Sequence, residues 1–163
     1  MLRLCFNIDL PEHHLQRIGG GVLLSERSLR GYKNREYNRF YPVILCLETL
    51  CQINEWHRSQ EHFPPLYKSG VFYEEEPPGE EEWLDTPTLR KTGKGDCEDI
   101  ACDRVAELRY HCGIPAVPCI KFKDFNVNGK VITLVHVMVL RPDGTLEDPS
   151  KVLGMGGNFD NKR

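Results

Sequence analysis

The sequence predicts one domain that combines α-helices with an antiparallel β-hairpin. Three observations support this prediction: an amphipathic segment at residues 42–60, a helix that begins at Cys97 behind a strong cap, and a β-branched run at residues 131–140 that leads into a tight turn. The chain has 163 residues, which is enough for one domain and short for two. With 40% hydrophobic and 28% charged residues, its composition is that of an ordinary globular protein.

Residues 42–60 form the first expected helix. Pro42 suits a first helical turn, and Pro64-Pro65 closes the segment. We expect this helix to pack into the core and to follow an N-terminal arm, the two together making up residues 1–63. Apolar residues spaced mostly three or four positions apart are expected to face the core, and Trp56, five positions after Cys51, is included with them: Ile44, Leu47, Leu50, Cys51 and Trp56.

The charge balance argues against nucleic acid as a partner. The chain has 21 basic and 24 acidic residues and a net charge of -3 at pH 7, whereas a nucleic-acid-binding face needs a basic excess. No apolar run approaches the roughly 18 residues of a membrane span, and the first residues lack the apolar core of a secretory signal. We therefore expect a cytoplasmic protein, or part of a larger assembly, without a membrane span.

A strongly acidic stretch occupies residues 74–82, where six carboxylates surround a Pro-Pro-Gly sequence. So many charges, broken by two prolines and a glycine, cannot be buried together. A solvated loop is the simpler interpretation. A docking loop for a basic partner is the alternative.

The seven cysteines are odd in number and are expected to be reduced thiols. From Cys97 to Cys119 they are spaced C-x4-C-x9-C-x6-C, without the close C-x2-C pair of a structural zinc site. Burial as small apolar residues is the expected role of Cys102, Cys112 and Cys119. We therefore expect neither a metal nor a cofactor.

Cys97 lies at the start of the second expected helix. Gly93 and Gly95 allow a tight turn before it. Asp96 is a good N-cap, and Asp99 falls at the third helical position, as in a capping box. A thiol in the first turn meets the positive end of the helix dipole and free backbone N–H groups, which favour the thiolate. Cys97 is therefore the candidate nucleophile if a base can reach its sulfur.

The helix that Cys97 heads is expected to end at Cys112. Gly113 can adopt the left-handed conformation that closes a helix, and Pro115 cannot continue one. One face of the helix is apolar and is expected to pack on the core. That face includes Ala101, Val105, Leu108 and Cys112.

His136 lies in the β-branched run at residues 131–140, and residues 141–145 suit a type I turn closed by a left-handed glycine. A hairpin with this turn would place His136 opposite Ser150. Asp148 would then be its diagonal neighbour on the same face of the sheet. An acid in that position would fix the imidazole tautomer and stabilise the imidazolium.

A lone histidine within an apolar strand is more often a core residue than a catalytic one. Here, however, a capped Cys97, a strand His136 and a hairpin Asp148 occur together. Their combination favours a Cys-His-Asp triad, in which one imidazole nitrogen pairs with the acid and the other addresses the thiol.

Five motifs follow one another along the chain: W-L-D-T-P at 83–87, G-D-C-E-D-I-A at 95–101, G-I-P at 113–115, H-V-M-V at 136–139 and E-D-P-S at 147–150. In this order they resemble the transglutaminase-like cysteine protease superfamily, and most of all its bacterial and phage-borne members. The resemblance covers residues 66–155, and the first 60 or so residues have no counterpart in it.

The resemblance implies a papain-like α+β core at residues 64–155, followed by a tail at 156–163. In such a core, a helix headed by the nucleophilic cysteine packs on an antiparallel sheet that carries the histidine and the acid. The implied roles are Cys97 as nucleophile, His136 as general base and then acid, and Asp148 as its orienting partner. The Cys97 backbone N–H would serve an oxyanion hole, and the Trp83 indole is either a second donor or simply a core aromatic.

The resemblance further implies attack of the thiolate on a carboxamide to give a thioester acyl-enzyme. Resolution by water makes a peptidase or amidase, and resolution by an amine makes a transglutaminase. Hydrolysis of a peptide or isopeptide bond in a protein or peptide substrate is our first expectation, because the short chain has no appended domain that could shape an amine site. The alternatives are a phage virion or assembly protein with a vestigial site, located in the virion beside other phage structural proteins, and a metal or redox protein.

Overall fold

The computed structural model describes residues 34–77 and 81–156. The chain divides into two units, Met1–Tyr41 and Pro42–Arg163, and the second contains every element described below apart from the first turns of helix α3. The expected N-terminal arm before residue 34, residues 78–80 of the acidic stretch and the tail from residue 157 lie outside the described residues.

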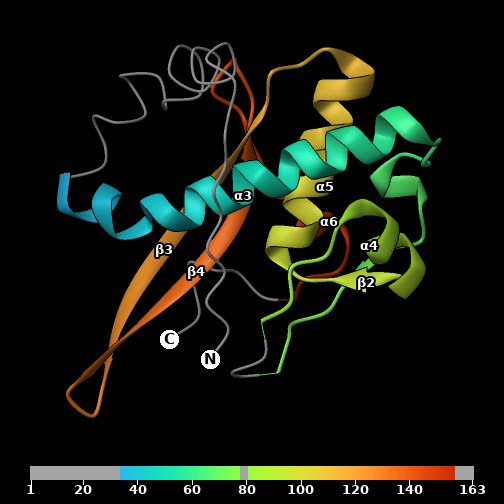
Figure 1. Cartoon of the computed structure of the whole chain (residues 1–163). Helices are drawn as coiled ribbons and strands as arrows, with labels where there is room; N and C mark the ends of the chain where they lie inside the picture. The colour runs from blue at the N-terminus through green and yellow to red at the C-terminus, as the bar shows by residue number, and fades with distance from the viewer. Residues whose placement is uncertain (1–33, 78–80, 157–163) are drawn as a thin grey trace. The chain divides into compact units, whose positions relative to one another are not determined.

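Helix α3 spans Asn34–Gln60 (Figure 1). The expected start at Pro42 is therefore wrong, since Pro42 lies inside the helix. Proline removes one helical hydrogen bond and is unfavourable there, yet the helix continues on both sides of it. From residue 47 onward one face of α3 is buried, and it consists of Leu47, Glu48, Leu50, Cys51, Asn54 and Arg58.

The apolar pattern of α3 misplaces Trp56, which is 59% exposed instead of buried. Two polar residues, Asn54 and Arg58, lie on the buried face nearby. The side-chain oxygen of Asn54, Oδ1, accepts the backbone N–H of Thr86 at 2.8 Å, and Arg58 donates to Asp103 at 2.6 Å. These partners, which are distant in sequence, let polar groups lie on the core face, whereas Trp56 is about 200° around the helix from Asn54 and so lies on the opposite side.

Four short elements lie between α3 and the helix headed by Cys97. They are the 3₁₀ turn η2 (Leu66–Lys68), strand β1 (Phe72–Tyr73), helix α4 (Thr86–Thr92) and strand β2 (Lys94–Gly95). Strands β1 and β2 pair in parallel. Helix α4 begins behind Asp85, whose side chain accepts the N–H of Thr88 at 3.0 Å.

Helix α5 spans Cys97–Cys112, as the sequence predicted. Its N-terminus has a capping box: Asp96 accepts the backbone N–H of the third helical residue, and the Asp99 carboxylate accepts the N–H of Asp96 at 3.3 Å. Its C-terminus closes at Gly113, which has a φ of 64° in the left-handed region. Both ends of the helix are thus set by the local signals that predicted them.

The main sheet has the order β3-β4-β5, and both pairs of strands are antiparallel. Strands β3 (Val117–Val127) and β4 (Lys130–Leu140) form a long hairpin that extends away from the helices (Figure 1). Strand β5 is only Leu146–Glu147, and Leu140 pairs with Leu146. The register predicted for the turn at residues 141–145 is therefore confirmed.

The predicted strand does not continue to Ser150, so the expected pairing of His136 with Ser150 across the sheet is wrong. Helix α6 (Pro149–Val152) begins instead, with Asp148 as its N-cap. Proline has no N–H to give to a strand ladder, and it is favoured in the first turn of a helix. Pro149 therefore ends the strand, and Asp148 lies at its boundary.

Helix α5 packs on strand β4. A helical layer on an antiparallel sheet is an α+β arrangement, so this part of the expected fold class is confirmed. Within residues 34–77 and 81–156, none of the helices has the length and apolar character needed to cross a bilayer. A small core beside the N-terminus of α5 consists of Leu66, Val71, Leu89 and Ile100, with Tyr73, Leu84 and Leu153 packed against it.

Gly95 lies in this part of the fold at a position where a larger side chain should be destabilising. A Cβ at Gly95 would lie 2.6 Å from Leu89 Cδ1 and 2.9 Å from Asp99 Oδ2. Both neighbours are buried, so Gly95→Ala should lower the free energy of unfolding by about 1–3 kcal/mol in urea denaturation. Gly156→Ala is the control, because nothing lies within 4 Å of a Cβ there. Equal stability of the two variants would contradict this prediction.

Candidate active site

Cys97 is the first residue of helix α5, and its side chain is partly exposed. Helix α5 packs on strand β4. The backbone N–H of Val137 hydrogen bonds to the Cys97 sulfur. Val137 directly follows His136, so the structure brings the candidate nucleophile to the strand position next to the candidate base.

His136 and Asp148 form a pair beside Cys97. His136 is 3% exposed on strand β4, and its Nε2 lies 3.1 Å from Asp148 Oδ2. The other carboxylate oxygen, Oδ1, accepts the backbone N–H of Lys151 at 3.2 Å and so caps helix α6. The two oxygens of Asp148 thus have separate tasks, and the start of α6 holds the acid in line with the imidazole.

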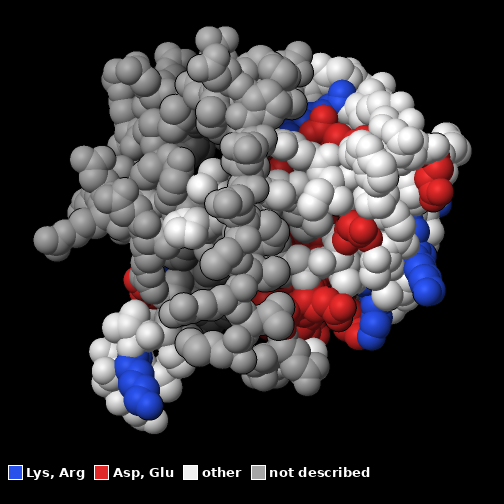
Figure 2. All heavy atoms as spheres, in the orientation of Figure 1, with Lys and Arg blue, Asp and Glu red and all other residues white. Residues whose placement is uncertain are grey.

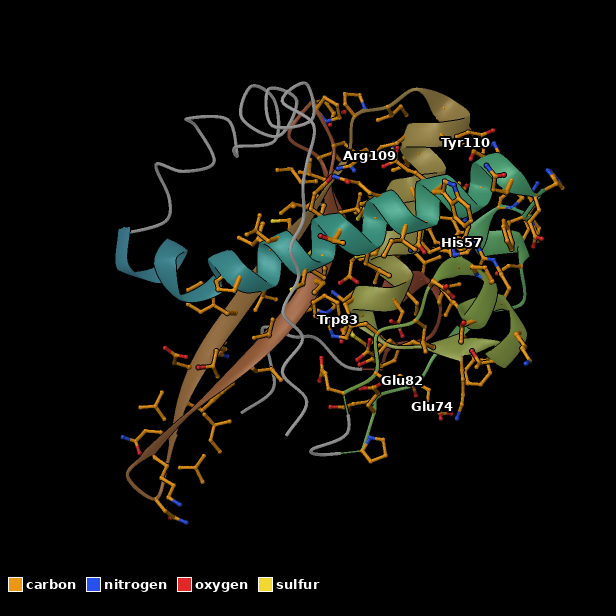
Figure 3. All side chains as sticks on the ribbon, viewed as in Figure 1. His57, Glu74, Glu82, Trp83, Arg109 and Tyr110 are labelled. Atoms are coloured by element: carbon orange, nitrogen blue, oxygen red, sulfur yellow. The ribbon has the colours of Figure 1, made fainter. Side chains whose placement is uncertain are left out.

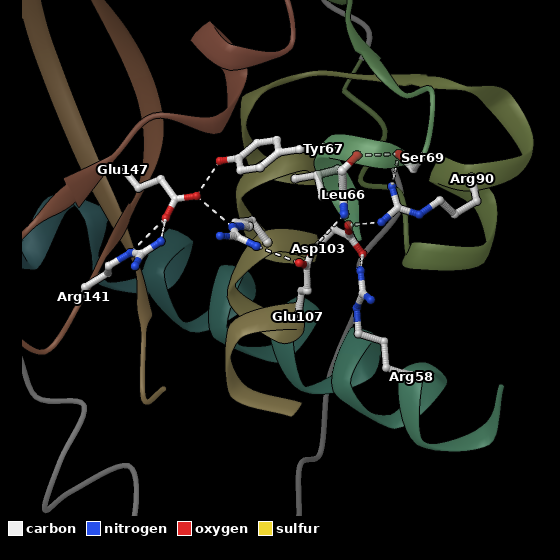
Figure 4. Close-up of polar contacts among 10 residues, drawn as sticks. Arg58, Leu66, Tyr67, Ser69, Arg90, Asp103, Glu107, Arg141 and Glu147 are labelled. Carbon is white, nitrogen blue, oxygen red and sulfur yellow. Dashed lines mark hydrogen bonds and ion pairs between the residues drawn. The ribbon is translucent and has the colours of Figure 1, made fainter. Parts of the chain in front are cut away.

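Glu147, next to Asp148, is held by three side chains (Figure 4). Arg104 Nε donates to it at 2.7 Å and Arg141 Nε at 2.9 Å, and the Tyr67 hydroxyl donates as well. Their hydrogen bonds and charges outweigh burial and lower the pKa of Glu147. The clamp joins η2, α5 and the hairpin turn, and it fixes the backbone immediately before the acid that pairs with His136.

The charge around Cys97 differs from the expected thiolate-stabilising environment. Burial raises the pKa of the Cys97 thiol well above its ordinary value, the Glu98 charge raises it further, and the Val137 N–H only partly opposes these effects. Glu98 Oε2 lies 3.2 Å from the sulfur and accepts from the thiol. Burial and the acidic neighbour therefore oppose the thiolate-favouring effect expected of the helix N-terminus.

Glu98 belongs to a group of carboxyls at the start of α5. Burial, together with hydrogen bonds and charge from Asp96 and Glu81, raises the pKa of Glu98 to about 10. Burial also raises the pKa of Asp99 to about 7, although the Leu84 N–H at 2.7 Å opposes that rise. At neutral pH, Glu98 is therefore a neutral carboxylic acid that can both donate and accept.

The described part of the acidic stretch is largely exposed, as expected of a solvated loop, and Glu81 also hydrogen bonds to Glu98. The Glu76 carboxylate accepts the backbone N–H of Glu82 at 3.0 Å, and the Trp83 indole N–H donates to Glu81 at 3.0 Å. Acidic side chains gather on the face where Figure 3 labels Glu74 and Glu82, as Figure 2 shows in red. In this state the Trp83 donor is directed to Glu81, and its role in an oxyanion hole stays a prediction.

The other described cysteines divide into buried and accessible thiols. Cys51 and Cys102 are buried, whereas Cys46 and Cys112 are exposed. Cys119 is partly exposed, which differs from its expected burial, and so does the exposure of Cys112. Over the part of the chain that the structure describes, no group of three His, Cys, Asp or Glu side chains could hold a metal ion.

Sequence reasoning missed two parts of this site. Glu98 stands inside the G-D-C-E-D motif, but its contact with the sulfur has no signature in the sequence. The Glu147 clamp depends on Tyr67 and Arg104, which are far away in sequence.

No protein-family model, curated protein sequence or solved structure matches the chain significantly.

Proposed function

We propose that the protein is a cysteine hydrolase that cleaves peptide or isopeptide amide bonds through Cys97, His136 and Asp148. The single observation behind this proposal is the His136–Asp148 pair at 3.1 Å on the strand against which the Cys97 sulfur lies. A buried acid that is aligned with an imidazole beside a helix-cap thiol has the parts that thiol catalysis requires.

The proposed reaction begins with transfer of the Cys97 thiol proton to Nδ1 of His136, because Nε2 is directed to Asp148. The thiolate attacks the amide carbonyl, and the carbonyl π electrons move to oxygen. The Cys97 backbone N–H, in the first turn of α5, is placed to stabilise that oxyanion. As the carbon–nitrogen bond breaks, His136 gives its proton to the leaving amine, and a thioester remains on Cys97.

Hydrolysis of the thioester reverses these roles. His136 accepts a proton from water, and the resulting hydroxide attacks the thioester carbonyl. The carbon–sulfur bond breaks, the acid product leaves, and the proton returns to Cys97. Throughout, Asp148 holds the ring in one tautomer and stabilises the imidazolium that forms twice in each cycle.

We also propose that residues 64–155 form a papain-like core. A helix headed by Cys97, packed on an antiparallel sheet that bears His136 and is followed by Asp148, is the arrangement that the resemblance to transglutaminase-like cysteine proteases implies. The order of the motifs along the chain supports this core. A protein or peptide would then be the substrate, in the cytoplasm or in a virion if the gene is phage-borne.

The test is amide cleavage by Cys97→Ser. A pool of peptide and isopeptide substrates is incubated with the full chain, and new amino and carboxyl termini are detected by mass spectrometry. Cys97→Ser should reduce cleavage at least about a thousandfold, since serine lacks an acidic thiol. Cys112→Ser, an exposed thiol on the same helix, should keep wild-type activity.

The outcomes separate the proposed function from its alternatives. Cleavage that survives in Cys97→Ser contradicts the proposal. Incorporation of an added primary amine in place of hydrolysis identifies acyl transfer. Absence of both reactions in wild type, across the whole substrate pool, also contradicts the proposal and favours the assembly role.

A further inference from the structure

We propose that Glu98 is a positioning residue that holds Cys97 at rest, by accepting the thiol hydrogen and keeping it away from His136. This inference rests on the proposed function, because the residue that Glu98 restrains is the proposed nucleophile. Activation would then require the thiol to exchange its Glu98 contact for one with the imidazole.

The contact between the two side chains is direct. Glu98 Oε2 lies 3.2 Å from Cys97 Sγ, and Glu98 is 6% exposed. Adjacent residues on a helix normally point in different directions. At the first turn, however, the Glu98 carboxyl folds back to the sulfur, so the contact is specific to this end of α5.

Two other acids, acting as hydrogen-bond acceptors, keep the Glu98 carboxyl in place. Asp96, the N-cap of α5, and Glu81, from the segment before α4, both hydrogen bond to Glu98. A neutral Glu98 has one O–H to donate to either acid, and its other oxygen stays available as the acceptor for Cys97. This accounts for both carboxyl oxygens in the resting arrangement.

The groups that face the Cys97 sulfur are mostly acidic. Glu98 and Asp96 oppose the thiolate from α5 and its cap, and the Tyr73 hydroxyl faces it from β1. From β4 comes the Val137 N–H, which favours the thiolate, and His136 precedes Val137 on that strand. Because the acids outweigh the single N–H, the sulfur keeps its proton until Glu98 is displaced or His136 takes it.

The test measures how fast iodoacetamide alkylates Cys97 across pH, with peptide mapping of each cysteine. The Cys97 thiol ionises in a pH range in which the Glu98 carboxyl has also become negative. Glu98→Gln therefore removes a charge that opposes formation of the thiolate. The Cys97 profile should move to lower pH by at least one unit. At a given pH above about 10, where wild-type Glu98 is charged, alkylation should therefore be about tenfold faster than in wild type, whereas at pH 7, where Glu98 is neutral, the two rates should be similar.

A matched control variant distinguishes the effect of the Glu98–Cys97 contact from that of the negative charge of the acidic stretch as a whole. Glu82→Gln removes one carboxylate from the same acidic stretch, but Glu82 is exposed and is not among the groups that shift the pKa of Cys97. Its Cys97 profile should match that of wild type. Exposed Cys112 serves as the internal reference, and a thermal unfolding curve checks that each variant is folded.

A second variant keeps the inference testable if Glu98→Gln does not fold. Glu98→Met has similar volume but offers neither charge nor a strong acceptor, and it should give the same shift to lower pH. An unchanged profile, or one displaced to higher pH, in a folded Glu98 variant overturns the inference.

His136→Ala distinguishes this inference from the proposed function. If His136→Ala slows Cys97 alkylation while Glu98 variants leave it unchanged, the triad stands and the restraint by Glu98 falls. If Glu98 variants accelerate alkylation while His136→Ala has no effect with or without them, the Glu98 contact stands and the triad falls.

Discussion

Asp103→Asn should lower the free energy of unfolding by about 3–5 kcal/mol. Asp103 is fully buried on α5 and accepts from Arg58 Nη2 at 2.6 Å and from Arg90 Nη2 at 2.5 Å (Figure 4). The Thr86 hydroxyl donates to the same carboxylate at 2.6 Å. Asparagine keeps the shape but leaves two largely buried guanidinium groups facing a neutral amide, which is costly in a low-dielectric interior.

Urea denaturation measures this loss, and an exposed ion pair provides the contrast. Glu74 pairs with Lys94, and each side chain is 49% exposed, so Glu74→Gln should cost less than about 1 kcal/mol. Both substitutions remove one carboxylate and differ mainly in burial. Comparable losses in the two variants would show that the Arg58–Asp103–Arg90 cluster does not anchor α3 and α4 to α5.

The features that sequence predicted well are those with local causes. The capping box of Asp96 and Asp99 and the closing Gly113 set α5 within a residue at each end, because each acts on its nearest backbone groups. The turn after β4 likewise set the register that leads to Asp148. Residues of this kind can be interpreted from a single chain, since their partners are only a few positions away.

The features that sequence did not predict depend on partners that folding brings from afar. Arg58 and Asp103 are 45 positions apart, and only their pairing explains why a charged residue lies on the core face of α3. At Pro149 two local signals disagree. The hairpin pattern favours continued strand pairing, whereas a proline ends a strand. The proline prevailed, and Asp148 became a helix cap.

The candidate site divides in the same way. The sequence brought His136 and Asp148 together through the hairpin, and the structure joins them at 3.1 Å, although through a cap and not a strand pair. The effect of Glu98 on Cys97 depends on side-chain direction and burial, which the motif does not encode. For this reason the raised pKa of the Cys97 thiol does not follow from its place at the helix N-terminus.

Asp148→Asn should reduce the rate of amide cleavage by about 10²–10⁴-fold with little loss of stability. Asparagine is as good an N-cap as aspartate, so its side-chain oxygen should keep the Lys151 N–H and preserve α6. The amide nitrogen must then face His136 Nε2. A donor in that position forces the ring proton onto Nδ1, the atom that has to accept the Cys97 proton, and the imidazole is left in the wrong tautomer.

Steady-state cleavage and Cys97 alkylation, each followed against pH, test the effect of Asp148→Asn, and urea denaturation checks its fold. Asp143→Asn is the control, since it removes one negative charge from the exposed turn of the same hairpin and should leave both profiles unchanged. If folded Asp148→Asn cleaves within about threefold of wild type, His136 does not need this acid to set its tautomer. In that case the 3.1 Å contact would serve α6 and the sheet only. A large loss in a variant that keeps its cap and its stability points to the imidazole, because among the described residues the cap is the other hydrogen bond that this carboxylate makes.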